Sequence, residues 1–261
     1  NELTDDEVLN SYISSSQNFE TDEVDRLIIL DHLEKKFFKN VSNKVEGYYT
    51  SVGMEVNIWT VKVSPKNEED ITQPPILFIH GLCAGIAHWT KAMDKASSNQ
   101  VCYFIDLPGF AKSSRPDFST SLDVAENAMI QFIENWRVNN KIEGQLRLVG
   151  HSFGGYISFL YAAKFPKNIS SLILLDPWGI YSSNLDTSQN KDGTKGLSLK
   201  LKMTKAGARY ISPMAIVRKT GMIGKFLLKS LRYELYLPYK DYVTQDTFFD
   251  YIVYTNMGQP T

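Results

Sequence analysis

The stretch QLRLVGHSFGGYISFLYAAK, from Gln145 to Lys164, predicts a short buried strand, a sharp turn and a helix in direct succession. The run LRLV is rich in apolar β-formers, and the residues after Gly155 have the apolar spacing of a helix. Between them lies GHSFG, a G-x-S-x-G motif centred on Ser152. In this context the motif predicts a nucleophile elbow, a strained turn that lifts the serine hydroxyl clear of the sheet. The alternative is a glycine-rich turn that only packs.

The residues around Ser152 suit acyl-transfer chemistry. Gly150 and Gly154 meet a steric demand, because a Cβ two residues before or after the serine would clash. Such a site also needs two N–H donors for the developing oxyanion. We expect one donor to be the backbone of Phe153 and the other to be Leu82, which follows Gly81 in the loop after an earlier strand. His80, at the end of that strand, is predicted to be structural.

The sequence contains no histidine in the position that a catalytic base should occupy. In this architecture the order is Ser, then Asp or Glu, then His. No histidine follows residue 151, and an elbow directs His151 away from its neighbour. We therefore expect the acid and the base to lie beyond Thr261, in a longer protein of which these residues are a part. Asp176, at a strand end, is a second acid candidate, although an Asp-Pro turn explains it equally well.

Apolar runs alternate with helical patterns along the middle of the chain, which predicts an α/β fold. The fold class expected is a mostly parallel central sheet flanked by helices, with right-handed crossovers and a helical cap. The expected strands are 46–51 and 54–63, which form a hairpin, and then 76–79, 101–105, 145–149 and 171–175. The expected helices are 89–96, 122–138 and the one that follows Ser152.

We divide the chain into three parts. Residues 1–44 form an acidic lead-in and an amphipathic helix, residues 45–180 form the first part of the α/β core, and residues 181–261 form a helical cap or lid. The end of the sheet is expected to lie outside this sequence. In the lead-in helix, from residue 20 to 39, the predicted apolar face consists of Val24, Leu27, Ile28, Leu33 and Phe37.

Composition excludes several classes of function. The net charge is -1, which gives no general attraction to nucleic acid. Four scattered histidines and two cysteines provide no zinc spacing, and neither a phosphate-binding P-loop nor a dinucleotide fingerprint is present, so no metal and no cofactor is expected. Cys83 and Cys102 make no disulfide framework, which favours a reducing, intracellular compartment.

Charge is distributed unevenly along the chain. Residues 1–34 hold ten acids and one base, whereas residues 193–233 hold ten Lys or Arg and no acid. A solvated helical face would account for the basic block, but its interleaved apolar residues suggest a cap that faces anionic lipid or phosphate head groups. The residues proposed for this contact are Lys200, Lys202, Lys205, Arg209, Arg218 and Lys219.

Several motifs occur together in this sequence and identify a family resemblance. They are FIHG followed by Ala84-Gly85 and Trp89, then DLPGF at 106–110 with SSRP at 113–116, then Glu126-Asn127, the GHSFGG run, and DPWG at 176–179. From about Val45 onward the chain resembles a lipid-handling subfamily of the α/β-hydrolases, the group of abhydrolase domain-containing proteins four and five. Three features depart from that pattern: Ala111 replaces a frequent glycine, no tryptophan-rich anchor is visible near the start, and no histidine has an aspartate five positions on.

The resemblance implies a lipid enzyme. Members include (lyso)phospholipases acting on N-acyl phospholipids, lysophosphatidic acid acyltransferases that use acyl-CoA as co-substrate, and a coactivator of triglyceride lipase at lipid droplets. Ser152 favours an enzyme, because the coactivator has asparagine at the elbow. Expected partners are a phospholipid or lysophospholipid substrate, an anionic membrane or droplet surface and a possible lipase. The expected location is the cytosol with peripheral association to lipid droplets, endoplasmic reticulum or mitochondria.

Overall fold

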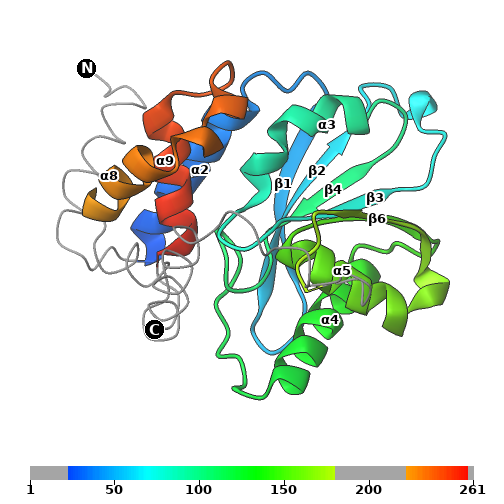
Figure 1. The fold of residues 1–261 in the computed structure, drawn as a ribbon. Helices are drawn as coiled ribbons and strands as arrows, with labels where there is room; N and C mark the ends of the chain where they lie inside the picture. Colours follow the sequence, from blue (N-terminus) through cyan, green and yellow to red (C-terminus); the bar gives the residue numbers. More distant parts are fainter. Residues whose placement is uncertain (1–22, 180–221, 258–261) are drawn as a thin grey trace, which may run out of the picture.

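A six-stranded sheet forms the centre of the computed structural model, which describes residues 23–179 and 222–257 (Figure 1). Its strand order is β1-β2-β4-β3-β5-β6. The strands are β1 (Lys44–Ser51), β2 (Asn57–Ser64), β3 (Ile76–Ile79), β4 (Cys102–Ile105), β5 (Leu146–His151) and β6 (Ile169–Leu175). The hairpin β1–β2 and the pair β2–β4 are antiparallel, whereas β4, β3, β5 and β6 run parallel to one another. The predicted mixed, mostly parallel sheet is confirmed.

The apolar β3 run is buried at every position, as expected for a central strand of a parallel sheet. Its neighbours place Phe78 beside Phe104 of β4 and Val149 of β5. Strands β3 and β5 therefore end at the same edge of the sheet, with Ile79 opposite Gly150. This register brings the loop after β3 next to the turn after β5, where the predicted nucleophile lies.

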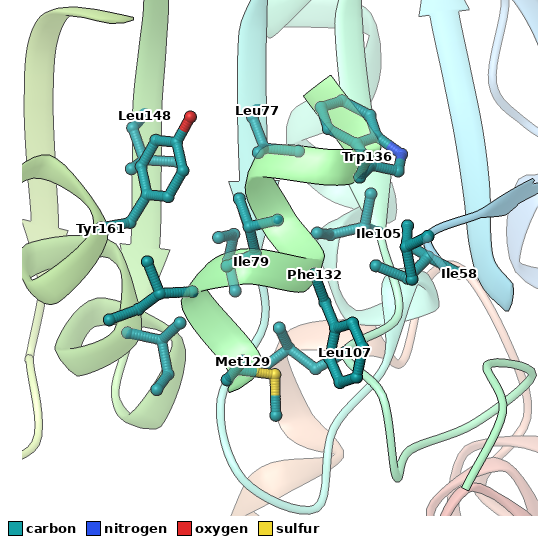
Figure 2. Close-up of a cluster of buried hydrophobic side chains, with 14 of the residues drawn as sticks. Ile58, Leu77, Ile79, Ile105, Leu107, Met129, Phe132, Trp136, Leu148 and Tyr161 are labelled. Carbon is teal, nitrogen blue, oxygen red and sulfur yellow. The ribbon is translucent and has the colours of Figure 1, made fainter. Parts of the chain in front are cut away.

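Helices cover both faces of the sheet. Helices α4 (Leu122–Asn139) and α5 (Phe153–Lys164) lie on one side, and α3 (Thr90–Ala96) lies on the other (Figure 1). The core under α4 is built from Met129, Phe132 and Trp136, which are spaced three to four residues apart and face the strands (Figure 2). Trp136 is fully buried, and its indole N–H donates to Thr60 Oγ1 of β2 at 2.9 Å.

A second hydrophobic cluster joins the two ends of the described chain. Helix α2 (Glu23–Phe38) packs against α9 (Gln245–Asn256), beside α8 (Met222–Leu231) (Figure 1). The face of α2 that is buried there differs from the predicted one. Ile29, Leu30, Leu33 and Phe37 form it, whereas Val24 and Ile28 are exposed. The prediction was right about Leu33 and Phe37 and wrong about Val24 and Ile28, because the buried side also contains Arg26 and Glu34, which an apolar pattern does not include.

Two lysines of the basic block 193–233 lie in the described residues of α8, and both form ion pairs with aspartates of α9. Lys225 Nζ lies 2.6 Å from Asp250 Oδ1, and Lys229 Nζ lies 2.7 Å from Asp246 Oδ1, so α8 is held to α9 by ion pairs. The six residues predicted to contact lipid head groups, Lys200 to Lys219, lie outside the described residues, and so does the polar loop 181–193. Within the described ranges, no helix has the length and apolar character that crossing a bilayer requires.

Candidate active site

Ser152 stands at the junction of β5 and α5 in a strained backbone conformation. Its φ is 51° and its ψ is −117°, a region that residues with a Cβ seldom adopt. The surrounding hydrogen bonds hold it there: Ser152 N–H donates to Leu175 O at 3.0 Å, and Trp178 N–H donates to Ser152 O at 2.9 Å. The predicted elbow geometry is therefore present, and the end of β6 helps to fix it.

The glycines of the motif occupy positions without room for a side chain. A Cβ on Gly154 would lie 2.8 Å from the carbonyl carbon of Ile79, and one on Gly150 would lie 2.7 Å from the Cα of Gly155. Real Cβ atoms essentially never approach other atoms within 3.0 Å. The close approach of α5 to the end of β3 thus depends on Gly154, and its close approach to β5 depends on Gly150.

The loop after β3 passes directly beside the serine. A Cβ on Gly81 would lie 3.0 Å from the Cβ of Ser152 and 2.9 Å from Nδ1 of His151. Leu82 follows immediately, and its side chain is 60% exposed. Phe153, the residue after the serine, begins α5. The two residues predicted to supply oxyanion donors thus flank Ser152 on separate segments, and their role as donors remains a prediction.

His80 is built into the fold. Leu107 N–H donates to its Nε2 at 3.0 Å, so Nδ1 carries the proton and donates to Gly81 O at 2.8 Å. Burial lowers the pKa of His80 to about 4, so the ring is neutral at physiological pH. These two bonds connect the loop after β3 to the loop after β4, which agrees with the structural role expected for His80.

None of the described histidines forms a hydrogen bond with the Ser152 hydroxyl. His88 is buried among Tyr239, Phe248 and Tyr251, with ring-centroid distances of 5.9, 5.7 and 5.6 Å. His151 adjoins the serine in sequence but is exposed. Asp176, the candidate acid, follows β6 with φ at 45°. The described chain therefore places Ser152 at a strained turn, with no histidine hydrogen-bonded to its hydroxyl.

An apolar pocket of about 410 Å³ opens beside the elbow. Both predicted donor residues, Leu82 and Phe153, line it. Its other walls come from the segment 108–118, from the first half of α4 including Met129, and from Trp178 after β6. Pockets of this size and character bind small organic ligands. The geometry therefore places an apolar binding volume next to a candidate nucleophile.

The loop 106–115, of which residues 108–110 line the pocket, is anchored to the helices α2 and α9. Arg26 of α2 donates to Ala111 O, and Ala111 N–H donates to Thr255 O of α9 at 3.0 Å. Arg115 donates to Thr255 O at 3.0 Å and to Met257 O at 2.9 Å, which satisfies carbonyls at the carboxyl end of α9. Both ends of the described chain therefore hold one wall of the pocket in place.

Buried carboxylates complete this anchor. Asp106 accepts the N–H groups of Ile86 at 2.9 Å and Lys112 at 3.1 Å, and burial raises the pKa of Asp106 to about 6. Lys112 Nζ lies 2.8 Å from Asp31 and 3.2 Å from Glu34, above the ring of Trp59. Burial raises the pKa of Glu34 to about 8, and Lys112 offsets only part of that shift.

Replacing Glu34 by glutamine is expected to remove a pH dependence of stability. Because the pKa of Glu34 is about 8 in the folded state and 4.5 for an unperturbed glutamate, the folded protein binds more protons between these values, and stability falls as pH rises through this window. The free energy of unfolding of the wild type, relative to Glu34→Gln, should fall by up to about 1.4 kcal/mol per pH unit. Urea denaturation of both proteins from pH 5 to 9 measures these free energies of unfolding. If the two free energies change in parallel with pH, the raised pKa of Glu34 is contradicted.

Comparison with known proteins gives the family. Residues 74–196 match the family model described as alpha/beta hydrolase fold. Abhydrolase domain-containing protein abhd-5.2 of Caenorhabditis elegans is 38% identical over 206 residues, 78% of this chain and 44% of that protein. The chain belongs to the α/β-hydrolase fold family. The resemblance to the abhydrolase domain-containing proteins four and five is confirmed by abhd-5.2 and by the two relatives described next.

Two further relatives have names that describe lipid enzymes. (Lyso)-N-acylphosphatidylethanolamine lipase of Bos taurus is 31% identical over 89% of this chain and 66% of its own length. 1-acylglycerol-3-phosphate O-acyltransferase ABHD5 of Sus scrofa is 30% identical over 78% of this chain and 56% of its own length. The chain thus spans about half to two thirds of the length of these curated relatives. Among solved structures, naproxen esterase from Bacillus subtilis shares the fold, with a TM-score of 0.57 and 13% identity over 90% of this chain.

Sequence reasoning found the elbow and its glycines but missed the polar anchors of the pocket. The sequence analysis assigned no role to Arg26, Glu34 or Lys112, and no local pattern indicates that they meet. A signal was available for Arg115, because the SSRP motif contributed to the family resemblance. Its structural meaning, a cap on helix α9, depends on a contact 140 residues away.

Proposed function

We propose that this chain belongs to a serine-nucleophile lipid hydrolase or acyltransferase that acts on glycerophospholipids. The observation that carries the proposal is the pocket wall shared by Leu82 and Phe153, which joins an apolar volume to the elbow of Ser152. In the proposed mechanism Ser152 Oγ attacks the ester carbonyl, and the backbone N–H groups of Phe153 and Leu82 stabilise the oxyanion.

The pocket suits an acyl chain. Aromatic side chains of Phe110, Phe153 and Trp178 line it, and the Phe153 and Trp178 rings are 6.0 Å apart. Burying a methylene group in such surroundings contributes about 0.8 kcal/mol, so a long chain would bind through many small gains. The head group would then remain at the mouth, toward a lipid surface.

The remaining catalytic groups are assigned to the part of the protein outside these residues. A serine hydroxyl without a base is a weak nucleophile, so a histidine and its acid must approach Ser152 in the active enzyme. The order Ser, Asp or Glu, His that is usual in this architecture is what supports a position after Ser152 for these groups. The names of two relatives, a lipase and an acyltransferase, support both reactions of the proposed site.

Product analysis of the full-length protein distinguishes the reactions. The protein is incubated with lysophosphatidic acid and oleoyl-CoA in one arm, and with a lysophospholipid or an N-acyl phospholipid in the other. Phosphatidic acid in the first arm identifies the acyltransferase, and free fatty acid in the second identifies the hydrolase. If neither product forms, the proposal is contradicted, and the non-enzymatic coactivator of a triglyceride lipase becomes the favoured function.

A further inference from the structure

The charged groups that line the apolar pocket are all of one sign. Among its lining residues in the described chain, Asp117 and Glu126 carry charge, and both are acids. Asp117 is exposed at the rim, whereas Glu126 is half-buried on the face of α4 that also presents Leu122 and Met129 to the pocket. A carboxylate in an apolar ligand pocket costs desolvation energy, and polar groups in such pockets usually set orientation and specificity.

Glu126 is held in place by a neighbour of the nucleophile. The Tyr156 hydroxyl donates to Glu126 Oε1, and this bond raises the pKa of Tyr156. Tyr156 itself lies one turn of α5 beyond Ser152, since its N–H donates to Ser152 O at 3.1 Å. Four helical residues advance about 6 Å along the axis. Glu126 also lines the same pocket of about 410 Å³ as Leu82 and Phe153, the residues on either side of the serine, so its carboxylate shares one apolar volume with any ligand charge that lies near Ser152.

A second tyrosine–glutamate hydrogen bond joins the same two helices, and comparison with it shows what is unusual about the Tyr156–Glu126 bond. The Tyr161 hydroxyl donates to Glu134 Oε2 at 2.6 Å, again from α5 to α4. Glu134 is neutralised by Arg137 at 2.7 Å and also accepts from Asn168. In the described chain Glu126 has no such cation within ion-pair distance, and its charge faces the pocket. Helix-to-helix bonding alone explains the Glu134 pair, but it leaves the uncompensated charge of Glu126 unexplained.

We propose that Glu126, positioned by Tyr156, is a charge filter that admits a neutral acyl ester and disfavours a free fatty-acid carboxylate in this pocket. The inference rests on the proposed function, because it assumes that the pocket holds the acyl chain. The ester carbonyl of the bound substrate carries no net charge, so Glu126 leaves its binding unchanged, and the short-lived oxyanion that follows has the backbone N–H groups of Phe153 and Leu82 to offset the repulsion. The carboxylate of a released fatty acid is repelled, which favours departure of the product and limits its inhibition.

Two ligands with the same chain test the filter without any turnover. Binding of oleate and of oleyl alcohol, both below their micelle concentrations, is measured by calorimetry at pH 8 on the full-length protein. Glu126→Gln keeps the shape and the acceptor for Tyr156 but removes the charge. It should bind oleate about 10-fold more tightly, the change expected for unit charges roughly 12 Å apart at an effective dielectric of about 20, with the affinity for oleyl alcohol unchanged.

Control variants separate the filter from general effects. Glu134→Gln makes the same chemical change two turns along α4 and should leave both affinities unchanged. Tyr156→Phe releases the Glu126 carboxylate and should tighten oleate binding by less than Glu126→Gln does. If oleyl alcohol binds normally but Glu126→Gln leaves oleate binding unchanged, the filter is overturned and the acyl pocket stands. If the wild-type protein binds neither ligand, the acyl pocket and the filter both fail.

Discussion

Replacing Ser152 by alanine in the full-length protein is expected to lower turnover of a lysophospholipid ester by at least about 10⁴-fold. The substitution removes the one hydroxyl that the elbow lifts beside the pocket, and it removes few packing contacts. The folded state should therefore survive, with a melting temperature close to that of the wild type. Initial rates of fatty-acid release, or of phosphatidic acid formation if the protein is an acyltransferase, measure the effect.

A matched serine controls for nonspecific effects. Ser170 lies on β6, where its hydroxyl donates to Leu146 O at 3.2 Å, away from the pocket lining. Ser170→Ala should keep nearly full activity. Turnover in Ser152→Ala within tenfold of the wild type would show that another group performs the chemistry. A large loss in both variants would point to a structural effect.

The second large effect is expected at Gly154, where alanine should destabilise the fold by about 3 kcal/mol or more. The added Cβ would lie 2.8 Å from the carbonyl carbon of Ile79 and closer still to the oxygens of Ile79 and His80. Backbone atoms cannot yield as a flexible side chain does, so α5 or the end of β3 must move. Because the loop after β3 begins there, activity should fall with stability.

Gly144 provides the control for this substitution. It lies in the loop before β5, and a Cβ there would meet no atom within 4 Å. Gly144→Ala should therefore change the free energy of unfolding by less than about 0.5 kcal/mol. Urea denaturation of the two variants measures the difference. Equal stabilities would mean that α5 does not approach β3 as closely as the structure describes.

The sequence predicted the parts of the fold that depend on local pattern. The apolar runs located strands β3, β4, β5 and β6 to within about two residues, and the G-x-S-x-G context located the strained serine. The hairpin β1–β2 and the parallel run of the later strands were also predicted, whereas the order of the strands in the sheet was not. Each of the predicted features is encoded in neighbouring residues, so a single sequence was sufficient.

Long-range polar contacts were beyond prediction. Helix α2 buries Arg26 and Glu34 because Ala111 O and Lys112 bind them from positions more than 75 residues away. Apolar periodicity assigns charged positions to solvent, and it therefore placed Val24 and Ile28 on the buried face and omitted Ile29 and Leu30. The pocket was not predictable for the same reason, because Glu126, Tyr156 and Trp178 come from three elements that only the fold brings together.

The most direct test of the central claim is the site of labelling by a fluorophosphonate probe, which reacts with activated serine hydroxyls. The full-length protein is labelled, digested and analysed by mass spectrometry. The account predicts a single phosphonylated peptide that carries the adduct on Ser152, with the label absent from Ser152→Ala and retained in Ser170→Ala. An adduct on a different serine, or equal labelling of the wild type and Ser152→Ala, would contradict it.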